Sequence, residues 1–543
     1  MTLEKNKTYP AEITDYTADG TGVCRIGGMV VFVPNSAAGD VCTVKIIKVN
    51  KTVAYGRMEE ILRPSPDRIS SACPVSAVCG GCCYQHISYA AELRIKQKKV
   101  QDALRRIAGL ELEVSGIVGS KQTAGYRNKG QYPVGQGEQG VYTGFYRRHS
   151  HQIIPVSRCA IQTEAADRLA GLVCEWMQAW GIPAYDEQKE TGLVRHVYVR
   201  TGMETGEVLL CLVTTKREVP GLEDLAQKAA AAVPDLCGLV LNLQPKPGNK
   251  VLGERNITVF GRGELEDVLC GNRFSISPLA FYQVHHDQAE NLYACAMEFA
   301  AFSGTERVLD LYCGAGTITL CAARQAAFVT GVEIVPAAVD NARENARRNG
   351  LHHVEFLCMD AGQAAARFAQ TGEKIDVVLV DPPRKGLDSG AAEAILRIAP
   401  ERVVYISCDP ATMARDVKRL GVRYEATACR AFDLFPRTHH VETVVSLVRK
   451  TPDDYIHVKL DLDDLDLTAA EAKATYSEIK EYVLKKFGLK VSSLYIAQVK
   501  EKYGIIEREN YNMSKKEDAV VPQCPKKKED AIVDALRHFK MIS

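Results

Sequence analysis

The sequence has no long apolar run and no excess of charge of one sign. No apolar stretch reaches the roughly 18 residues that a membrane-spanning helix needs. The first ten residues, MTLEKNKTYP, lack the apolar core of a signal peptide. We therefore expect a cytoplasmic protein with no membrane contact. The formal net charge is only +1, so total charge indicates no particular partner.

Size and composition predict an ordinary multidomain globular protein. The 543 residues are too many for one hydrophobic core, and 46% are apolar and 25% charged. The chain contains 18 cysteines. In a reducing compartment these do not form a disulfide framework, so closely spaced cysteines call for a metal or catalytic explanation.

Positive charge is concentrated in one segment. Between Arg94 and Arg148 there are eleven Lys or Arg residues and four Asp or Glu residues, a local difference of +7. Aromatic residues are interleaved with them, namely Tyr126, Tyr132, Tyr142, Phe145 and Tyr146. This mixture favours a surface that contacts phosphates and stacks on bases, although a solvated basic face could also produce it.

Residues 1–62 contain five short β-prone runs separated by turn signals such as Asp19-Gly20 and Gly27-Gly28. Such closely spaced strands predict a small β-barrel of the OB type, whose exposed face commonly binds RNA. The stretch resembles the TRAM domain, an RNA-binding module of RNA-modifying enzymes. The alternative is a barrel that only packs against its neighbour.

Three cysteines follow the barrel within one glycine-containing loop, CPVSAVCGGCCYQH. This three-cysteine loop and one distant cysteine fit an iron-sulfur cluster better than structural zinc, which usually takes two separated Cys pairs or a Cys/His mixture. The predicted [4Fe-4S] ligands are Cys73, Cys79, Cys82 and Cys159. Zinc, plain packing, a mixed site with His86, and Cys83 as the fourth ligand remain alternatives.

Residues 63–270 are predicted to form a central α+β domain around this cluster. A basic helical stretch runs from Arg94 to Ile107, and strand-like alternation recurs at 193–200, 207–215 and 238–245. This pattern predicts a mostly antiparallel sheet. It contains no catalytic constellation, so we expect it to hold the cluster and help present RNA.

From residue 271 to 450 strands and helices alternate, which predicts a doubly wound, Rossmann-like domain. The run RVLDLYCGAGTITL places Gly314 and Gly316 in a turn between a strand and a helix, where the backbone can approach a ligand closely. Glu333 ends the next strand and can accept hydrogen bonds from a ribose. Asp360 and Asp381 close the third and fourth strands.

A cysteine follows the β-prone run Val403–Ile406 in the sequence VVYISCDP. In an open α/β sheet the crevice beyond the strand ends binds ligands, so Cys408 is placed to act as a nucleophile. A half-buried structural cysteine is the alternative. Further motifs follow other predicted strands and should meet in the same crevice: DPPRKGL at 381–387 and DLFPRTHHVETV at 433–444.

These motifs together closely resemble the RNA uracil-5-methyltransferase family, and FSISPLAFYQVH at 274–285 matches it as well. The glycine turn, DxYCGxG, is similar to the S-adenosylmethionine loop of class I methyltransferases. The resemblance implies cofactor contacts from Gln283, Tyr312, Gly314, Gly316, Glu333, Asp360 and Asp381. The family usually has asparagine where this chain has His285, whose role stays open. The four cysteines with the N-terminal barrel resemble the 23S rRNA branch.

The resemblance also implies a mechanism. C5 of uracil is a weak nucleophile, so the Cys408 thiolate adds at C6 to activate it, and Glu442 is the implied general base that removes the C5 proton. The target uridine must be single-stranded or flipped out. A tRNA enzyme and a catalytically silent RNA-binding or assembly factor are the alternatives. A radical enzyme would need CxxxCxxC, whereas five residues separate Cys73 from Cys79.

Residues 451–543 are additional to the family core. The stretch 451–466 contains six Asp and one Lys and reads as an acidic connector. Three amphipathic helices are predicted after it, within EAKATYSEIKEYVLKKFGLKVSSLYIAQVKEKYG and EDAIVDALRHFKMI. This small helical extension suits either a nucleic-acid-binding or a protein-interaction module.

Overall fold

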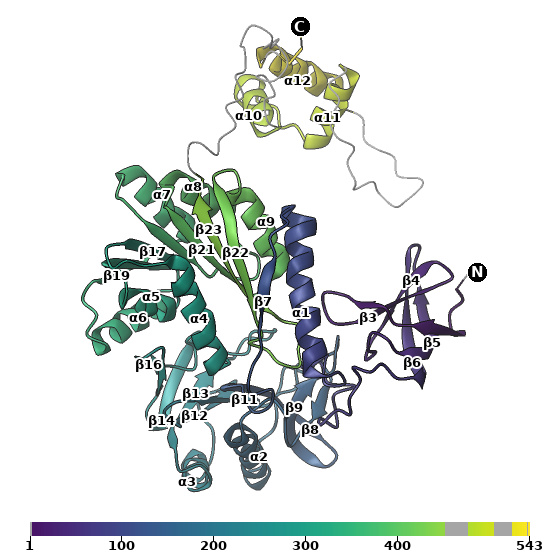
Figure 1. Cartoon of the computed structure of the whole chain (residues 1–543), viewed down its shortest axis with the longest axis vertical. Coiled ribbons are helices and arrows are strands. Elements are labelled where there is room, and N and C mark those ends of the chain that lie inside the picture. The colour runs from purple at the N-terminus through teal and green to yellow at the C-terminus, as the bar shows by residue number, and fades with distance from the viewer. Residues whose placement is uncertain (1–2, 451–475, 504–523, 540, 543) are drawn as a thin grey trace. The chain divides into compact units, whose positions relative to one another are not determined.

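The computed structural model describes residues 3–450, 476–503, 524–539 and 541–542, which belong to two compact units divided after Asp454 (Figure 1). The first unit contains three large β-sheets, and the second contains three helices. No helix in these described ranges is long and apolar enough to cross a membrane.

The N-terminal region is a curved six-stranded sheet, a half-barrel where a five-stranded barrel was predicted. Its strands are β1 Thr8–Glu12, β2 Asp15–Tyr16, β3 Gly22–Ile26, β4 Met29–Val33, β5 Val41–Val49 and β6 Val53–Arg63. The sheet order is β1-β5-β6-β4-β3-β2. The first predicted run bends between β1 and β2, and its halves pair with β5 and with β3. Within residues 3–63 these halves do not pair with each other, which leaves the sheet open.

The central sheet is mostly antiparallel, as predicted. It is formed by β8 Lys129–Gly137, β9 Gly140–Tyr146, β10 Ile153–Pro155, β11 Val194–Thr201, β12 Val208–Thr214, β13 Leu236–Leu243 and β14 Arg255–Gly261. Their order is β10-β9-β8-β11-β12-β13-β14, and only β12 and β13 run parallel. Helices α2 Glu164–Ala179 and α3 Leu222–Ala232 bury their apolar stripes on this sheet.

The third sheet confirms the doubly wound fold. Its strands are β17 Arg307–Leu311, β18 Phe328–Glu333, β19 Val354–Cys358, β20 Val377–Val380, β21 Arg402–Ser407, β22 Tyr424–Phe432 and β23 Glu442–Arg449. The order β19-β18-β17-β20-β21-β23-β22-β7 reverses between β17 and β20, where such sheets bind ligands. The helices are α4 His286–Ala300, α5 Thr317–Ala323, α6 Pro336–Arg348, α7 Ala361–Thr371, α8 Ser389–Ile398 and α9 Pro410–Leu420. Two separate cores pack against this sheet.

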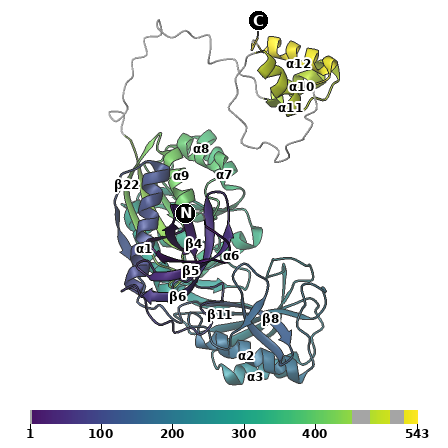
Figure 2. The same ribbon diagram turned by 90° about the vertical axis from the view of Figure 1, so that its right-hand side faces the viewer.

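Two elements from the segment 63–270 pack on the third sheet instead of the central one. Strand β7 Val114–Val118 pairs in parallel with β22 at the sheet edge. Helix α1 Tyr89–Ala103, continued by a π-helical turn at Leu104–Ala108, lies beside β22 and α9 (Figures 1 and 2). The hairpin of β15 Leu265–Leu269 and β16 Asn272–Ile276 spans the predicted boundary at residue 270. The polypeptide therefore ties the two sheets together.

A buried ionic network joins α1 to the loop between β22 and β23. Lys96 is 1% exposed, and its Nζ donates to Glu92 Oε1 at 2.7 Å, to Asp433 Oδ1 at 2.6 Å and to the Phe435 carbonyl at 3.1 Å. The Tyr89 hydroxyl donates to Asp433 Oδ2 at 2.8 Å. Burial raises the pKa of Glu92 to about 7, and the Lys96 ammonium opposes this shift. The Arg437 guanidinium also lies 3.8 Å from Glu92 Oε2, so two cations face the two buried carboxyls.

The same network fixes the backbone of Arg437, which adopts a left-handed φ of 72°. Such a φ is strained for a residue with a side chain. The Arg437 amide donates to Glu92 Oε1 at 2.7 Å, and its carbonyl accepts from the amides of Cys83 and Tyr84, each at 3.0 Å. The loop before Glu442 is therefore held both by α1 and by the cysteine loop.

The second unit contains the three helices that the sequence predicted, α10 Tyr476–Phe487, α11 Ser493–Lys502 and α12 Lys526–His538. Their shared core is made by one apolar face of each helix: Ile479, Val483, Ile496, Val499, Ile532 and Leu536. The predicted acidic connector at 451–466 lies outside the described residues.

We expect Lys96→Met to lower the free energy of unfolding by about 3–5 kcal/mol at pH 8, because Glu92 and Asp433 would remain buried without the lysine that pairs with both. Burial raises the pKa of Glu92 to about 7, so a proton can neutralise this carboxyl at low pH and the loss should shrink at pH 5. Urea denaturation at the two pH values measures this. Lys98→Met, which removes a half-exposed lysine of the same helix, is the control. An equal loss at both pH values would contradict the expectation.

Candidate active site and cysteine cluster

Cys408 lies between the end of β21 and the start of α9, as the sequence predicted. Strand β21 ends at Ser407, and Asp409 caps α9 by accepting from the amides of Ala411 and Thr412, each at 2.9 Å. Pro410 occupies the first helical turn, where its missing N–H costs nothing. The half-buried thiol is thus held at the carboxyl edge of the sheet.

Three charged side chains lie close enough to the Cys408 thiol to change its pKa: Glu442, Asp381 and Arg384. Glu442 begins β23, which pairs antiparallel with β21 so that Ser407 faces Thr443. Burial, together with Glu442 and Asp381, raises the pKa of Cys408 to about 11, while Arg384 opposes this shift. Burial and Asp381 raise the pKa of Glu442 to about 8, again against Arg384. The motifs that the sequence predicted to converge are therefore close in space.

The glycine turn is shaped for close approach to a ligand. Gly316 has a φ of 84°, and a Cβ there would lie 3.1–3.2 Å from Leu320, Ala342 and Phe356. Gly314 has a φ of 55° and open space where a Cβ would point. Tyr312 is also left-handed, with a φ of 69°, and its hydroxyl donates to Asp388 at 3.3 Å. A strained residue beside an open glycine is typical of a functional turn.

Glu333 is oriented by this turn. Its two carboxylate oxygens accept from the amides of Gly314 at 3.2 Å and Val335 at 2.9 Å. Ile334 follows it at the strand tip and is 62% exposed.

Asp360 caps α7 by accepting from the Gly362 amide at 2.9 Å. Burial raises the pKa of nearby Asp310 to about 7, with further contributions from Asp381 and Glu333. Asp310, Glu333 and Asp381 are therefore close in space, near the ends of neighbouring strands.

Gln283 and His285 lie before α4. The Gln283 carbonyl accepts from Asn128 at 2.8 Å, which ties this segment to the central sheet. His285 is buried, with Nε2 2.7 Å from the Ser120 hydroxyl and its ring stacked on Tyr126 at 4.7 Å. The histidine found here in place of the family's usual asparagine therefore has a packing role.

The four predicted cluster cysteines, Cys73, Cys79, Cys82 and Cys159, line one cavity of about 200 Å³. Cys83 instead packs against Ala37, Tyr84 and Ile87 in a separate apolar cluster. His86 contacts the Ser36 carbonyl at 3.1 Å, facing the N-terminal sheet. Within the described part of the chain, no group of three or more His, Cys, Asp or Glu side chains is spaced to hold a metal ion.

The basic, aromatic-rich segment is only partly a surface. Tyr126 and Tyr132 are buried, and Lys96 belongs to the ionic network, so these residues cannot stack on bases or contact phosphates. Tyr142, Phe145 and Tyr146 are partly exposed. The local charge count could not separate buried from exposed side chains, which is why the prediction overstated this surface.

Comparison with known proteins decides the family. Residues 88–450 match the tRNA (Uracil-5-)-methyltransferase family, and residues 3–58 match the TRAM domain. This chain belongs to that family. An RNA methyltransferase of Halalkalibacterium halodurans is 41% identical over 450 residues, 82% of this chain and 98% of that protein. One of Clostridium tetani is 39% identical over 446 residues, 82% of this chain and 96% of that protein.

A solved relative agrees in architecture. The tRNA (uracil-54, C5)-methyltransferase of Pyrococcus abyssi, in complex with S-adenosyl-L-homocysteine, covers 81% of this chain and 100% of its own, with a TM-score of 0.67 and 28% identity. Membership establishes an S-adenosylmethionine-dependent RNA methyltransferase of the uracil-5 type.

Several residues of this methyltransferase site were not predicted. Arg384 was visible in the DPPRKGL motif, and its charge beside an acid could have indicated its role. Asp310 was visible in the strand before the glycine turn. Lys96 and Glu92 carried no such signal, because their partner Asp433 lies more than 300 positions along the chain.

We expect Arg384→Gln to slow the alkylation of Cys408 several-fold at pH 8. Arg384 lowers the pKa of the thiol, so removing its charge raises that pKa above about 11 and leaves less thiolate at any lower pH. Iodoacetamide labelling from pH 7 to 10, read by mass spectrometry of the Cys408 peptide, measures this. Lys385→Gln removes the neighbouring cation as a control. An unchanged pH profile would contradict the role of Arg384.

Proposed function

We propose that this enzyme methylates C5 of a uridine in 23S rRNA through a covalent bond between Cys408 and C6 of the base. The observation that carries the proposal is the convergence of Cys408, Glu442 and Asp381 at the carboxyl edge of one sheet, beside the glycine turn. S-adenosylmethionine, when bound, supplies an electrophilic methyl group. The open space at Gly314 and the fixed carboxylate of Glu333 fit such a cofactor.

The chain's own residues account for the other steps. The Cys408 sulfur, as thiolate, forms a bond to C6, and the electron pair of the C5–C6 double bond moves to C5, which takes the methyl group. Glu442 then removes the C5 proton, the C5–C6 double bond re-forms, and the Sγ–C6 bond breaks. The raised pKa of Glu442, about 8, makes its carboxylate a stronger base than an ordinary glutamate. Gln283, Tyr312, Gly316, Asp360 and Asp381 are proposed to complete the cofactor site.

Two RNA substrates are supported by different observations. The four cysteines together with the TRAM domain support 23S rRNA by resemblance. The Pyrococcus abyssi relative, a tRNA enzyme, matches 81% of this chain, so similarity on this scale does not separate the two classes and tRNA is the second candidate. Mapping 5-methyluridine in both RNAs after incubation with the enzyme distinguishes them.

We also propose that Cys73, Cys79, Cys82 and Cys159 hold a [4Fe-4S] cluster with a structural role. Four soft thiol ligands around one cavity suit iron-sulfur chemistry. A cluster is larger than a single ion, so its ligands lie farther apart than those of an ion. The methyl transfer consists of polar two-electron steps and needs no electron from a cluster.

Cys408→Ala should abolish methylation while leaving cofactor binding intact, because the thiol lies outside the glycine turn. The wild-type enzyme should form a covalent complex with RNA containing 5-fluorouridine, seen on a denaturing gel, and the variant should form none. A wild-type enzyme that transfers methyl groups without any such complex would exclude the nucleophile.

In the same assay on ordinary RNA, Glu442→Gln should accumulate protein joined to methylated RNA, because the C5 proton is not removed. Free product released at the wild-type rate would remove Glu442 from the role of base.

Cys159→Ser should reduce folding yield and RNA affinity before it affects cofactor binding, since the loop 73–82 would lose its tie to the loop between β10 and α2. Anaerobically purified wild type should contain about four iron and four sulfide per chain. Cys83→Ser, on a cysteine outside the cavity, is the matched control for iron content. Zinc in place of iron, or full iron retention after Cys159→Ser, would contradict the assignment.

A further inference from the structure

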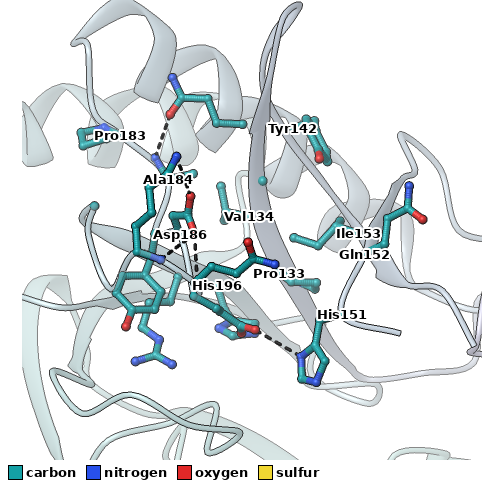
Figure 3. A pocket seen from close by; sticks show the side chains of 18 of the residues that line it. Pro133, Val134, Tyr142, His151, Gln152, Ile153, Pro183, Ala184, Asp186 and His196 are labelled. Carbon is teal, nitrogen blue, oxygen red and sulfur yellow. Dashed lines mark hydrogen bonds and ion pairs between the residues drawn. The ribbon is translucent and has the colours of Figure 1, made fainter. Parts of the chain in front are cut away.

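A cavity of about 980 Å³ opens on the central sheet, separate from the methyltransferase crevice (Figure 3). Its walls are the β8–β9 hairpin, the segment around Gln152, and the stretch from Pro183 to His196. This volume lies at the upper end of the range for small-molecule sites and exceeds what one nucleotide needs. The activity described above leaves this cavity without a role.

Aromatic and neutral polar groups line the cavity. Tyr142, Tyr146 and Tyr185 are all partly exposed there. The Tyr142 ring lies directly on Gly135, where a Cβ would be 2.7 Å from the ring, so the glycine gives the ring a flat and rigid support. His196 is only 6% exposed, and its Nδ1 has no hydrogen-bond partner. Burial lowers the pKa of His196 to about 4, so at neutral pH its ring offers one donor and one acceptor.

The cationic side chains that line this cavity already have hydrogen-bond or ion-pair partners. Arg195 donates from its two terminal nitrogens to the carbonyls of Gln244, Lys246 and Gly248, at 3.2, 2.6 and 3.1 Å. Glu187 contacts His151 at 3.2 Å, and Asp186 pairs with Lys189 at 3.2 Å. Two carboxylates beside paired cations disfavour a phosphate but accommodate an uncharged ring.

A second cavity, of about 670 Å³, adjoins the first. Tyr146, Ser150 and His151 line both cavities. The second cavity is also lined by Arg147 and Arg148, and on its other side by His439 and His440 of the loop that leads to Glu442. Arg384 lies 3.4 Å from His440 Nε2. Arg147 and Arg148 therefore lie in the second cavity, and its histidine-bearing wall contacts Arg384 near Cys408.

We propose that the tyrosine-lined cavity binds one unstacked base of the RNA substrate, a nucleotide other than the methylated uridine. This inference rests on the proposed function for its RNA ligand. The sugar-phosphate backbone follows Arg147 and Arg148 in the second cavity. The base enters the first cavity, stacks on Tyr142 or Tyr185, and takes a hydrogen bond from neutral His196. Such a pocket selects the RNA by a base at a fixed distance from the target.

The test uses the full chain, total bacterial RNA and irradiation at 254 nm, which joins stacked bases to aromatic side chains. Nucleotide adducts are expected on peptides that contain Tyr142 or Tyr185. Tyr142→Ala should weaken RNA binding about tenfold, as expected for one lost stacking partner. Gly135→Ala, which keeps the tyrosine but displaces its ring, should weaken binding in the same direction. Phe260→Ala removes an exposed aromatic of the same sheet outside both cavities and should change binding less than twofold.

Heparin is the probe that separates charge from base recognition, because it is a polyanion without bases. Tyr142→Ala should bind heparin as the wild type does, and weaker heparin binding would overturn the assignment to a base. Unchanged RNA affinity of Tyr142→Ala, or adducts formed only outside the cavity, would overturn it too. If adducts form on Tyr142 but no 5-methyluridine appears, the proposed function fails while the pocket stands. If 5-methyluridine appears without these adducts, the pocket alone fails.

Discussion

The contact on which the site most depends is the salt bridge of Lys96 with Glu92 and Asp433. All three side chains are buried, and burying these charges is favourable only because Lys96 pairs and hydrogen-bonds with both carboxyls. The network fixes the loop that follows β22 against α1. Because Glu442 ends that loop, the placement of the candidate base relative to Cys408 depends on a lysine far from it in sequence. Burial converts an otherwise ordinary helical ion pair into a constraint on the active site.

Around Cys408, burial and charge raise the pKa values of the acidic groups and so disfavour their anions. Cys408, Glu442, Asp381 and Asp310 all have raised pKa values because burial disfavours their anions, and neighbouring carboxylates add to the shifts of Cys408, Glu442 and Asp310. Arg384 only partly compensates. In the protein without ligands, Cys408 and Glu442, with pKa values of about 11 and about 8, are therefore mostly neutral near pH 7, whereas Asp381, with a pKa of about 6, is mostly ionised. A cationic ligand such as a sulfonium beside these groups would favour the thiolate and the carboxylate. A neutral thiol is less reactive than a thiolate, so this arrangement lowers the reactivity of Cys408 when no ligand is bound.

The sequence predicted those features that local patterns determine. A strand followed by a glycine turn can be recognised within about ten residues of sequence, and so can a strand followed by a cysteine and a helix cap such as Asp409. The convergence of Asp381, Cys408 and Glu442 was predicted because each of their motifs follows a strand of one sheet. The pairing of β7 with β22 and the burial of Tyr126 and Tyr132 were not predictable in this way. The β7–β22 pairing and the hydrogen bond of Tyr126 to the Pro436 carbonyl join segments hundreds of residues apart, whereas Tyr132 is buried against α2, where it contacts Asp167. Periodicity reports none of these contacts. An N-terminal β-sheet was predicted, but the first predicted strand bends into two, so the sheet has six strands where five were predicted.

The contacts of the cysteine loop, residues 73–82, would give the proposed iron-sulfur cluster a structural role in an enzyme whose methyl transfer needs no electron. Gly80 donates to the Tyr146 carbonyl at 2.9 Å, and the amides of Cys83 and Tyr84 hold Arg437, so this loop contacts both the tyrosine-bearing hairpin and the loop before Glu442. Residues 69–87 contain no helix or strand and bury few apolar side chains, so they cannot hold these positions through a hydrophobic core of their own. A group bound by four thiolates would supply the missing rigidity at the point where RNA-facing and catalytic loops meet. The proposed cluster would then join the Lys96 network and the strained Arg437 in supporting the loop before Glu442.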